Sequence, residues 1–154
     1  MKDKMKQALL NKIQSLKKEN ADPERAEMLK LIEESLSRPV YKNLTVSILS
    51  EIKDEELEQK IFDSIAANIE GRNRQEKEIV RSLTPGQRAI YITWIVEAEV
   101  RNGGFNQFYF NSSGQFATAL PEALKLVGAT QFADLSERAN STFEKEKSKI
   151  TEDQ

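Results

Sequence analysis

Apolar residues recur every three to four positions along most of the chain, which is the spacing of one buried face on an α-helix. No segment alternates apolar and polar residues for long enough to predict a β-strand. The pattern therefore predicts an all-α fold, a single-domain bundle of about seven to eight helices. The expected helices cover residues 5–16, 23–36, 41–52, 54–69, 85–102, 114–127 and 132–143, with shorter helical pieces near 79–83 and 105–109.

Sequence signals for helix ends agree with this pattern. Asp22 before Pro23 is typical of a helix start, because Asp caps and Pro fits the first helical position. The run TPGQ at residues 84–87 combines a capping box with a proline in the first turn. We expect Asp54 to cap the helix that follows it, and we expect the helix after residue 84 to end at a glycine corner at residues 103–104.

The chain length of 154 residues predicts one domain with a core of its own. Within it we expect three parts. Residues 1–20 form a basic amphipathic helix that is loosely attached, residues 21–147 form the helical domain, and residues 148–154 form a disordered tail.

The composition excludes several kinds of chemistry. The chain has no cysteine and no histidine, so it lacks disulfides, thiolate catalysis, the Ser-His-Asp triad and the commonest transition-metal ligands. We expect no catalytic residues, no metal and no cofactor. No apolar run is long enough to span a bilayer, and no signal peptide is recognisable, so we expect a cytoplasmic protein without a membrane partner. The net charge of −2 argues against direct nucleic-acid binding.

Charge is concentrated locally. Residues 51–70 contain seven acidic residues and two lysines. Several of the acids fall where a helix begins, and carboxylates there complement the helix dipole. The same cluster is a candidate surface for binding a partner, formed by Asp54, Glu55, Glu56, Glu58 and Asp63.

Residues 97–114, with the sequence EAEVRNGGFNQFYFNSSG, are unlike an ordinary helix surface. Two adjacent glycines and four aromatic residues stand among many amides, and Phe105, Phe108 and Tyr109 have the spacing of a short helix with one face buried. One interpretation is a tight structural corner whose amides bond the turn. The other is a polar ligand pocket. The residues concerned in either case are Glu97, Glu99, Asn102, Gly103, Gly104, Phe105, Gln107, Tyr109 and Asn111.

The spacing of the acids in this segment disfavours catalysis. Glu97 and Glu99 are two residues apart and do not share a helix face, so they make a poor acid–base or metal-binding pair. Glu97 and Arg101 have the spacing of a surface ion pair. The glycines lack the Lys-Ser/Thr of a phosphate-binding loop and do not follow a strand.

Residues 97–114 closely resemble the core motif of the bacterial DNA-mimic-protein-like family, a domain of unknown function. Similar stretches lie upstream at residues 54–63 and downstream at residues 121–124, 127–129 and 132–139, so the resemblance covers about residues 40–145. It implies an all-helical fold and no known catalytic activity. For the studied branch it also implies a homodimer whose surface carboxylates imitate DNA phosphates and occupy the DNA-binding face of a transcription regulator.

The charge balance of this chain argues against DNA mimicry, although it does not bear on the family resemblance. A decoy for a phosphate array needs an excess of carboxylates, whereas 25 acids here stand against 23 bases. We expect the acids to be interrupted by Lys and Arg on the folded surface. The leading hypothesis is a non-enzymatic cytoplasmic protein that binds another protein, for example a DNA-binding regulator. The alternatives are a small-ligand or enzymatic pocket beside residues 97–114, a true DNA mimic, and an immunity protein for a toxin.

Overall fold

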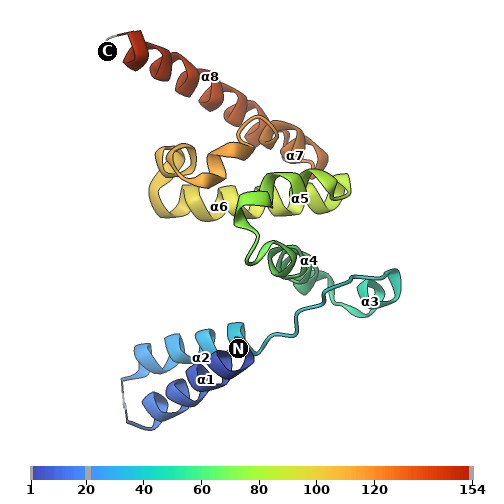
Figure 1. Cartoon of the computed structure of the whole chain (residues 1–154), viewed down its shortest axis with the longest axis vertical. Coiled ribbons are helices and arrows are strands. Elements are labelled where there is room, and N and C mark those ends of the chain that lie inside the picture. The colour runs from blue at the N-terminus through green and yellow to red at the C-terminus, as the bar shows by residue number, and fades with distance from the viewer. Residues whose placement is uncertain (1, 20–21, 153–154) are drawn as a thin grey trace. The chain divides into compact units, whose positions relative to one another are not determined.

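The computed structural model describes residues 2–19 and 22–152, and every regular element in these residues is helical. The predicted all-α, multi-helix fold is confirmed. Two short 3-10 helices, η1 and η2, accompany the α-helices (Figure 1). The elements are α1 (Lys2–Glu19), α2 (Pro23–Ser37), α3 (Val46–Glu51), α4 (Asp54–Ile69), η1 (Asn73–Gln75), α5 (Glu76–Ser82), α6 (Pro85–Phe110), η2 (Ser112–Phe116), α7 (Leu120–Leu126) and α8 (Thr130–Glu152).

Contacts along the chain divide it into two compact units, Met1–Val40 and Tyr41–Gln154. The sequence pattern predicted a division at residue 20 instead. The difference arises because the apolar stripe of α1 packs on α2, where Ile13 and Leu29 are buried. A helical hairpin is the smallest arrangement in which both stripes find a partner.

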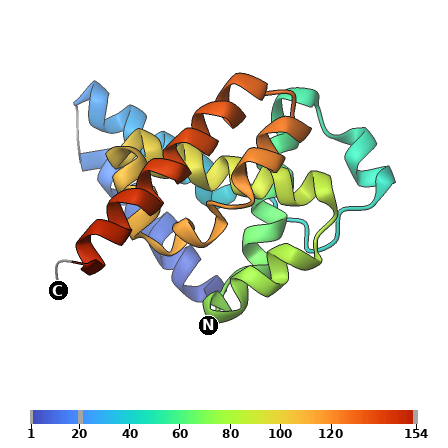
Figure 2. The same ribbon diagram turned by 90° about the horizontal axis from the view of Figure 1, so that it is seen from above.

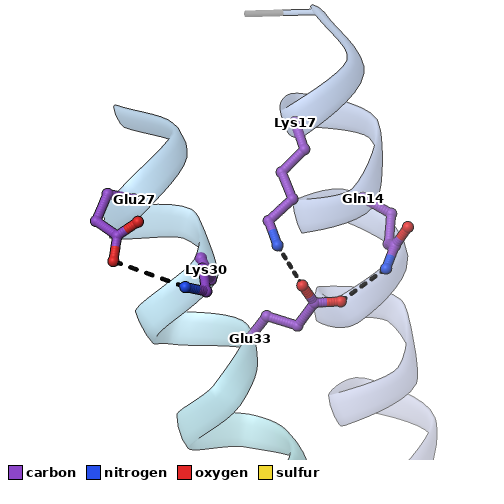
Figure 3. A network of polar contacts seen from close by, with 5 residues as sticks. All are labelled: Gln14, Lys17, Glu27, Lys30 and Glu33. Atoms are coloured by element: carbon purple, nitrogen blue, oxygen red, sulfur yellow. Dashed lines mark hydrogen bonds and ion pairs between the residues drawn. The ribbon is translucent and has the colours of Figure 1, made fainter. Parts of the chain in front are cut away.

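The first unit is held together by one carboxylate as well as by its apolar seam. Glu33 of α2 accepts a hydrogen bond of 2.7 Å from Gln14 of α1 and forms an ion pair with Lys17 (Figure 3). The bond from Lys17, followed by that from Gln14, holds the pKa of Glu33 below its usual range.

The second unit is built around α6. This helix contacts α4, α5, α7 and η2, and α7 in turn contacts α8. In both views of the ribbon, α7 and α8 lie on one side of α6 (Figures 1 and 2). The core of the unit consists of apolar side chains from α4 to α7, with Phe108, Ile92, Leu120 and Val80 nearly inaccessible to solvent.

Most of the predicted helix ends are confirmed. Asp22 accepts from the backbone N–H of Glu24, and the capping box of Thr84 and Gln87 is present at the start of α6. The expectation for Asp54 is wrong: it is the first residue of α4, and Lys53 occupies the cap position without a side-chain cap bond. A carboxylate in the first turn can complement the helix dipole without the geometry of a cap.

Two predicted helices are shorter than expected, and the last helix is longer. The side chain of Thr45 caps α3 at Ile48, so the helix covers only part of residues 41–52. The expected helix 114–127 is divided into η2 and α7. Helix α8 continues to Glu152, within the segment 148–154 that we expected to be a disordered tail, and residues 153–154 lie outside the described residues.

Candidate functional site

The helical backbone of α6 is broken at Gly103 and Gly104, as the sequence predicted, and a second helical segment follows the two glycines. Gly104 has φ +70° and ψ −171°, a conformation that residues with a Cβ rarely adopt. The φ of Gly103 is −150°, but a Cβ at this position would lie 2.4 Å from Oε1 of Gln107. The first glycine supplies space and the second supplies the backbone angle, so the helix changes direction and continues to Phe110.

The carboxylate of Glu99 lies at the centre of this corner. It accepts hydrogen bonds from Nε2 of Gln107 at 2.6 Å, Nδ2 of Asn111 at 2.8 Å and Oγ of Ser113 at 2.9 Å. These bonds join the two segments of α6 and η2. The donors, Gln107 foremost, hold the pKa of Glu99 below its usual range.

The amide of Gln107 completes the network. Its Oε1 accepts a hydrogen bond of 2.8 Å from Nδ2 of Asn102, while its Nε2 donates to Glu99. Asn102 and Glu99 both lie before the kink, and Gln107 lies after it. The amides therefore bond the two sides of the corner to each other and leave the carboxylate with three protein donors.

A third glycine allows the chain to close on itself after the corner. A Cβ at Gly114 would lie 2.6 Å from the carbonyl oxygen of Tyr109 and 3.1 Å from that of Phe108. Both neighbours are backbone atoms, which cannot move as a flexible side chain would. The Ser-Ser-Gly run thus brings η2 against the end of α6, within reach of Glu99.

Glu97 does not join this network. It forms an ion pair of 2.6 Å with Arg101 on the exposed side of α6, as the spacing predicted. Of the predicted corner residues, the structure brings together Glu99, Asn102, Gln107 and Asn111 and leaves Glu97 apart. The polar groups bond one another instead of facing an open pocket, which is the geometry of a structural corner.

The aromatic residues of the segment have separate environments. Phe108 is fully buried in the core, while Tyr109 stacks on Phe143 of α8 with ring centroids 4.2 Å apart. The hydroxyl of Tyr109 donates a 2.7 Å hydrogen bond to Oδ1 of Asn140, whose Nδ2 donates to the carbonyl of Ala117. Burial raises the pKa of Tyr109. These contacts attach α8 to the kinked part of α6.

An apolar groove of about 810 Å³ lies beside these aromatic residues, between the end of α6 and the middle of α8. Figure 2 shows α8 crossing this end of α6. Phe110 is 80% exposed at its edge and meets Phe143 edge-on. The α6–α8 groove is lined by Phe105, Asn106, Tyr109 and Phe110 from α6, and by Leu135, Arg138, Ala139, Thr142, Phe143, Glu146 and Lys147 from α8.

The sequence analysis found only part of this groove. Phe105 and Tyr109 were among the candidates, whereas Phe110 and the residues of α8 were not. Phe110 carried a usable signal, because it falls outside the buried stripe of Phe105, Phe108 and Tyr109 and a large aromatic residue in an exposed position is unusual.

The acidic residues of α4 are mostly exposed. Asp54, Glu55 and Glu56 occupy the first turn, where they complement the helix dipole, and Glu58 is exposed one turn later. Glu56 lies 4.0 Å from the ammonium of Lys60, and Asp63 accepts a 2.8 Å hydrogen bond from Gln59. Lys60 itself is buried, so its contact with Glu56 does not place a cation on the exposed surface of the acidic cluster.

Two further properties bear on function. Within the described residues, no group of three or more acidic side chains is placed to hold a metal ion. Among the helices of this same part of the chain, none combines the length and the apolar character that crossing a membrane requires.

The structure is thus an all-helical fold organised around a glycine corner. Residues 81–154 match the family model described as DMP19-like protein, so this part of the chain is similar to that family. The match contains α6, the corner and the α6–α8 groove, and it leaves out α4, which the resemblance at residues 54–63 had included. Neither the curated proteins nor the solved structures yield a match.

Proposed function

We propose that this chain is a non-enzymatic cytoplasmic protein that acts by binding another protein through the α6–α8 groove. The observation that carries the proposal is the apolar groove itself, with Phe110 80% exposed at its edge. Exposed aromatic residues beside a concave apolar surface are typical of the anchoring positions of protein interfaces.

The chemistry of the corner supports a binding role over a catalytic one. Glu99 is the carboxylate with the most hydrogen bonds in the segment, and its donors are all amide or hydroxyl groups of the protein. A carboxylate held ionised in this way is a poor general base, because its pKa lies far below neutral pH. The sequence offers no histidine or cysteine in its place.

A photo-crosslinking experiment tests the proposal in the native host. A photoreactive amino acid replaces Phe110 in one variant and Val46 of α3 in a control variant, because the two residues are 80% and 83% exposed. We expect the Phe110 position to give one dominant crosslinked protein and the Val46 position to give none. Equal adducts from both positions, or none from either, would contradict docking at the groove.

The acidic residues of α4 provide a second candidate surface. Asp54, Glu55 and Glu58 are exposed, and no ion pair within the described residues occupies them. They suit a basic partner such as a DNA-binding regulator. Reversal of these three charges, compared with Phe110→Ser, assigns a captured partner to one surface or the other by the variant that loses it.

Direct imitation of DNA is less well supported. Glu97 pairs with Arg101 and Glu137 pairs with Lys125, and both cations are exposed, so basic groups stand among the surface carboxylates. A regulator built for a phosphate array would meet these cations too. A small-ligand pocket and an immunity protein for a toxin are the remaining alternatives. A ligand pocket would use the same apolar groove without the polar residues of the corner.

A further inference from the structure

The α1–α2 hairpin has two faces of different character. On one face, polar side chains of both helices line a shallow groove that includes Asn11, Lys18 and Ser37. Glu33 lies at this groove and bonds Gln14 and Lys17 (Figure 3). This face is therefore occupied by its own polar contacts.

The opposite face is apolar and exposed. Taking the buried Ile13 as the direction of the partner helix, helical periodicity places Met5 and Leu9 on the side of α1 away from Asn11 and Lys18. By the same argument from Leu29, Met28 and Ile32 lie on that side of α2. Their exposed fractions are 73% for Met5, 47% for Leu9, 53% for Met28 and 40% for Ile32.

The hairpin buries very few side chains for a unit that also exposes an apolar face. Of its described residues, only Ile13 and Leu29 are buried. Folded units below about 40 residues rarely sustain a core without further support. Four exposed apolar side chains grouped on one face of so small a unit indicate a surface for docking.

The charges around the apolar face are mainly positive. Helical periodicity places Lys12 of α1 and Arg25 of α2 on this face, and both are exposed without an ion pair within the described residues. Among the acidic residues of α2, Glu24 lies one turn before Met28 and shares this rim, while the others lie elsewhere. Glu33 is bonded in the polar groove, and Glu27 lies 4.0 Å from Lys30 on the outer side.

We infer that the apolar, basic-rimmed face of the α1–α2 hairpin binds an acidic amphipathic helix of a partner protein. Apolar anchors of such a helix would cover Met5, Leu9, Met28 and Ile32, and carboxylates beside them would meet Lys12 and Arg25. A second copy of the hairpin would bring like charges together. A lipid surface is less suited, because residues 1–40 contain no Trp, Tyr or Phe.

This inference is independent of the α6–α8 groove and of the family match, which begins at residue 81. It uses a different surface in a different unit of the chain. A variant of the groove therefore serves as a control: Phe110→Ser leaves binding at the hairpin unchanged, whereas it removes the partner proposed for the groove.

The experiment uses the full chain and two designed helical peptides. Each peptide is about five turns long with a stripe of leucines; one has Glu beside the stripe and the other has Lys. Fluorescence anisotropy at low and moderate salt measures binding. We expect the Glu peptide to bind about ten-fold or more tightly than the Lys peptide, with an affinity that falls as salt is added.

Point variants then test the face. Met28→Glu and Lys12→Glu are expected to weaken binding of the Glu peptide by about ten-fold and several-fold. Lys4→Glu makes the same charge change as Lys12→Glu but lies in the stripe of Asn11 and Lys18, so it should leave the affinity within about two-fold. Circular dichroism of each variant checks that the helices are retained.

Four outcomes would overturn the inference. Equal binding of the two peptides would show that the charges of the face do not select the partner. Equal effects of Lys4→Glu and Lys12→Glu would show that the peptide responds to the overall charge of the hairpin and not to this face. Self-association that Met28→Glu abolishes would assign the face to a second copy. Binding to vesicles containing phosphatidylglycerol, without binding to the Glu peptide, would assign it to a lipid surface.

Discussion

At the scale of single residues, Glu99 holds the structural corner together, because it accepts hydrogen bonds from several polar side chains around it. Its ionised form accepts bonds from Gln107, Asn111 and Ser113, so these bonds favour the carboxylate over the acid. The sequence identified every one of these residues except Ser113 as a candidate. It did not show which carboxylate would be central, because Glu97 and Glu99 lie on different faces of the helix and the kink decides toward which face Gln107 and Asn111 turn.

Replacement of Glu99 tests this assignment through pH. The folded-state pKa of Glu99 is depressed from 4.5, so its contribution to stability is present above the unfolded pKa and is lost as pH falls through the folded pKa. We expect Glu99→Gln to lower the melting temperature at pH 7, with the difference from wild type shrinking below about pH 4.5. Thermal unfolding followed across this range measures it.

The matched control for that experiment is Glu97→Gln. Glu97 lies two residues away and pairs with Arg101 on the exposed side of α6. Exposed ion pairs contribute little, so this variant should unfold close to the wild-type temperature at every pH. A loss in melting temperature as large as that of Glu99→Gln would contradict a specific role for the hydrogen bonds that Glu99 accepts at the corner.

The glycines of the chain give a second test at this scale. Gly114→Ala places a Cβ 2.6 Å from the carbonyl oxygen of Tyr109, so we expect a loss of about 1–3 kcal/mol in the free energy of unfolding. Gly86 has no atom within 4 Å of the corresponding position, so Gly86→Ala should be neutral or slightly stabilising. Chemical denaturation of both variants compares them directly, and similar values would refute the close approach at Gly114.

At the scale of elements, the sequence predicted helices well where a strong cap or a long apolar stripe was present. The starts of α2 and α6 follow from Asp22 and from Thr84 with Gln87. The two helical segments on either side of Gly103 and Gly104 were predicted, but the direction of the second segment could not be. That direction depends on which residues after the glycines find a core, and here Phe108 is fully buried.

The attachment of α8 to this kinked helix depends on Asn140. It accepts from the hydroxyl of Tyr109 and donates to the carbonyl of Ala117, and so it joins α8 to α6 and to the segment after η2. We expect Asn140→Ala to cost about 1–3 kcal/mol, since two partly buried polar groups lose their partners. Ser141→Ala, one position along the exposed side of the same helix, is the control, and equal melting curves for the two variants would contradict this role.

At the scale of the whole molecule, the two units differ in how much apolar surface they bury. The second unit has a core formed by α4 to α7, which the spacing of apolar residues anticipated. The separation of the first unit at Val40 could not be anticipated, because the stripes of α1 and α2 resemble those of the other helices. The helices of the two units differ in the fraction of each apolar stripe that packs against another helix. A single sequence does not contain that information.

This difference predicts unequal local stability. Hydrogen exchange followed by mass spectrometry should show amides of α1 and α2 exchanging orders of magnitude faster than those around Ile92 of α6, because opening the hairpin exposes only Ile13 and Leu29. Ile13→Ala should accelerate exchange in both helices of the hairpin and leave α6 unchanged, since the two units have separate cores. Uniform protection along the chain, or an effect of Ile13→Ala that reaches Ile92, would mean that the hairpin and the domain unfold together as one cooperative unit.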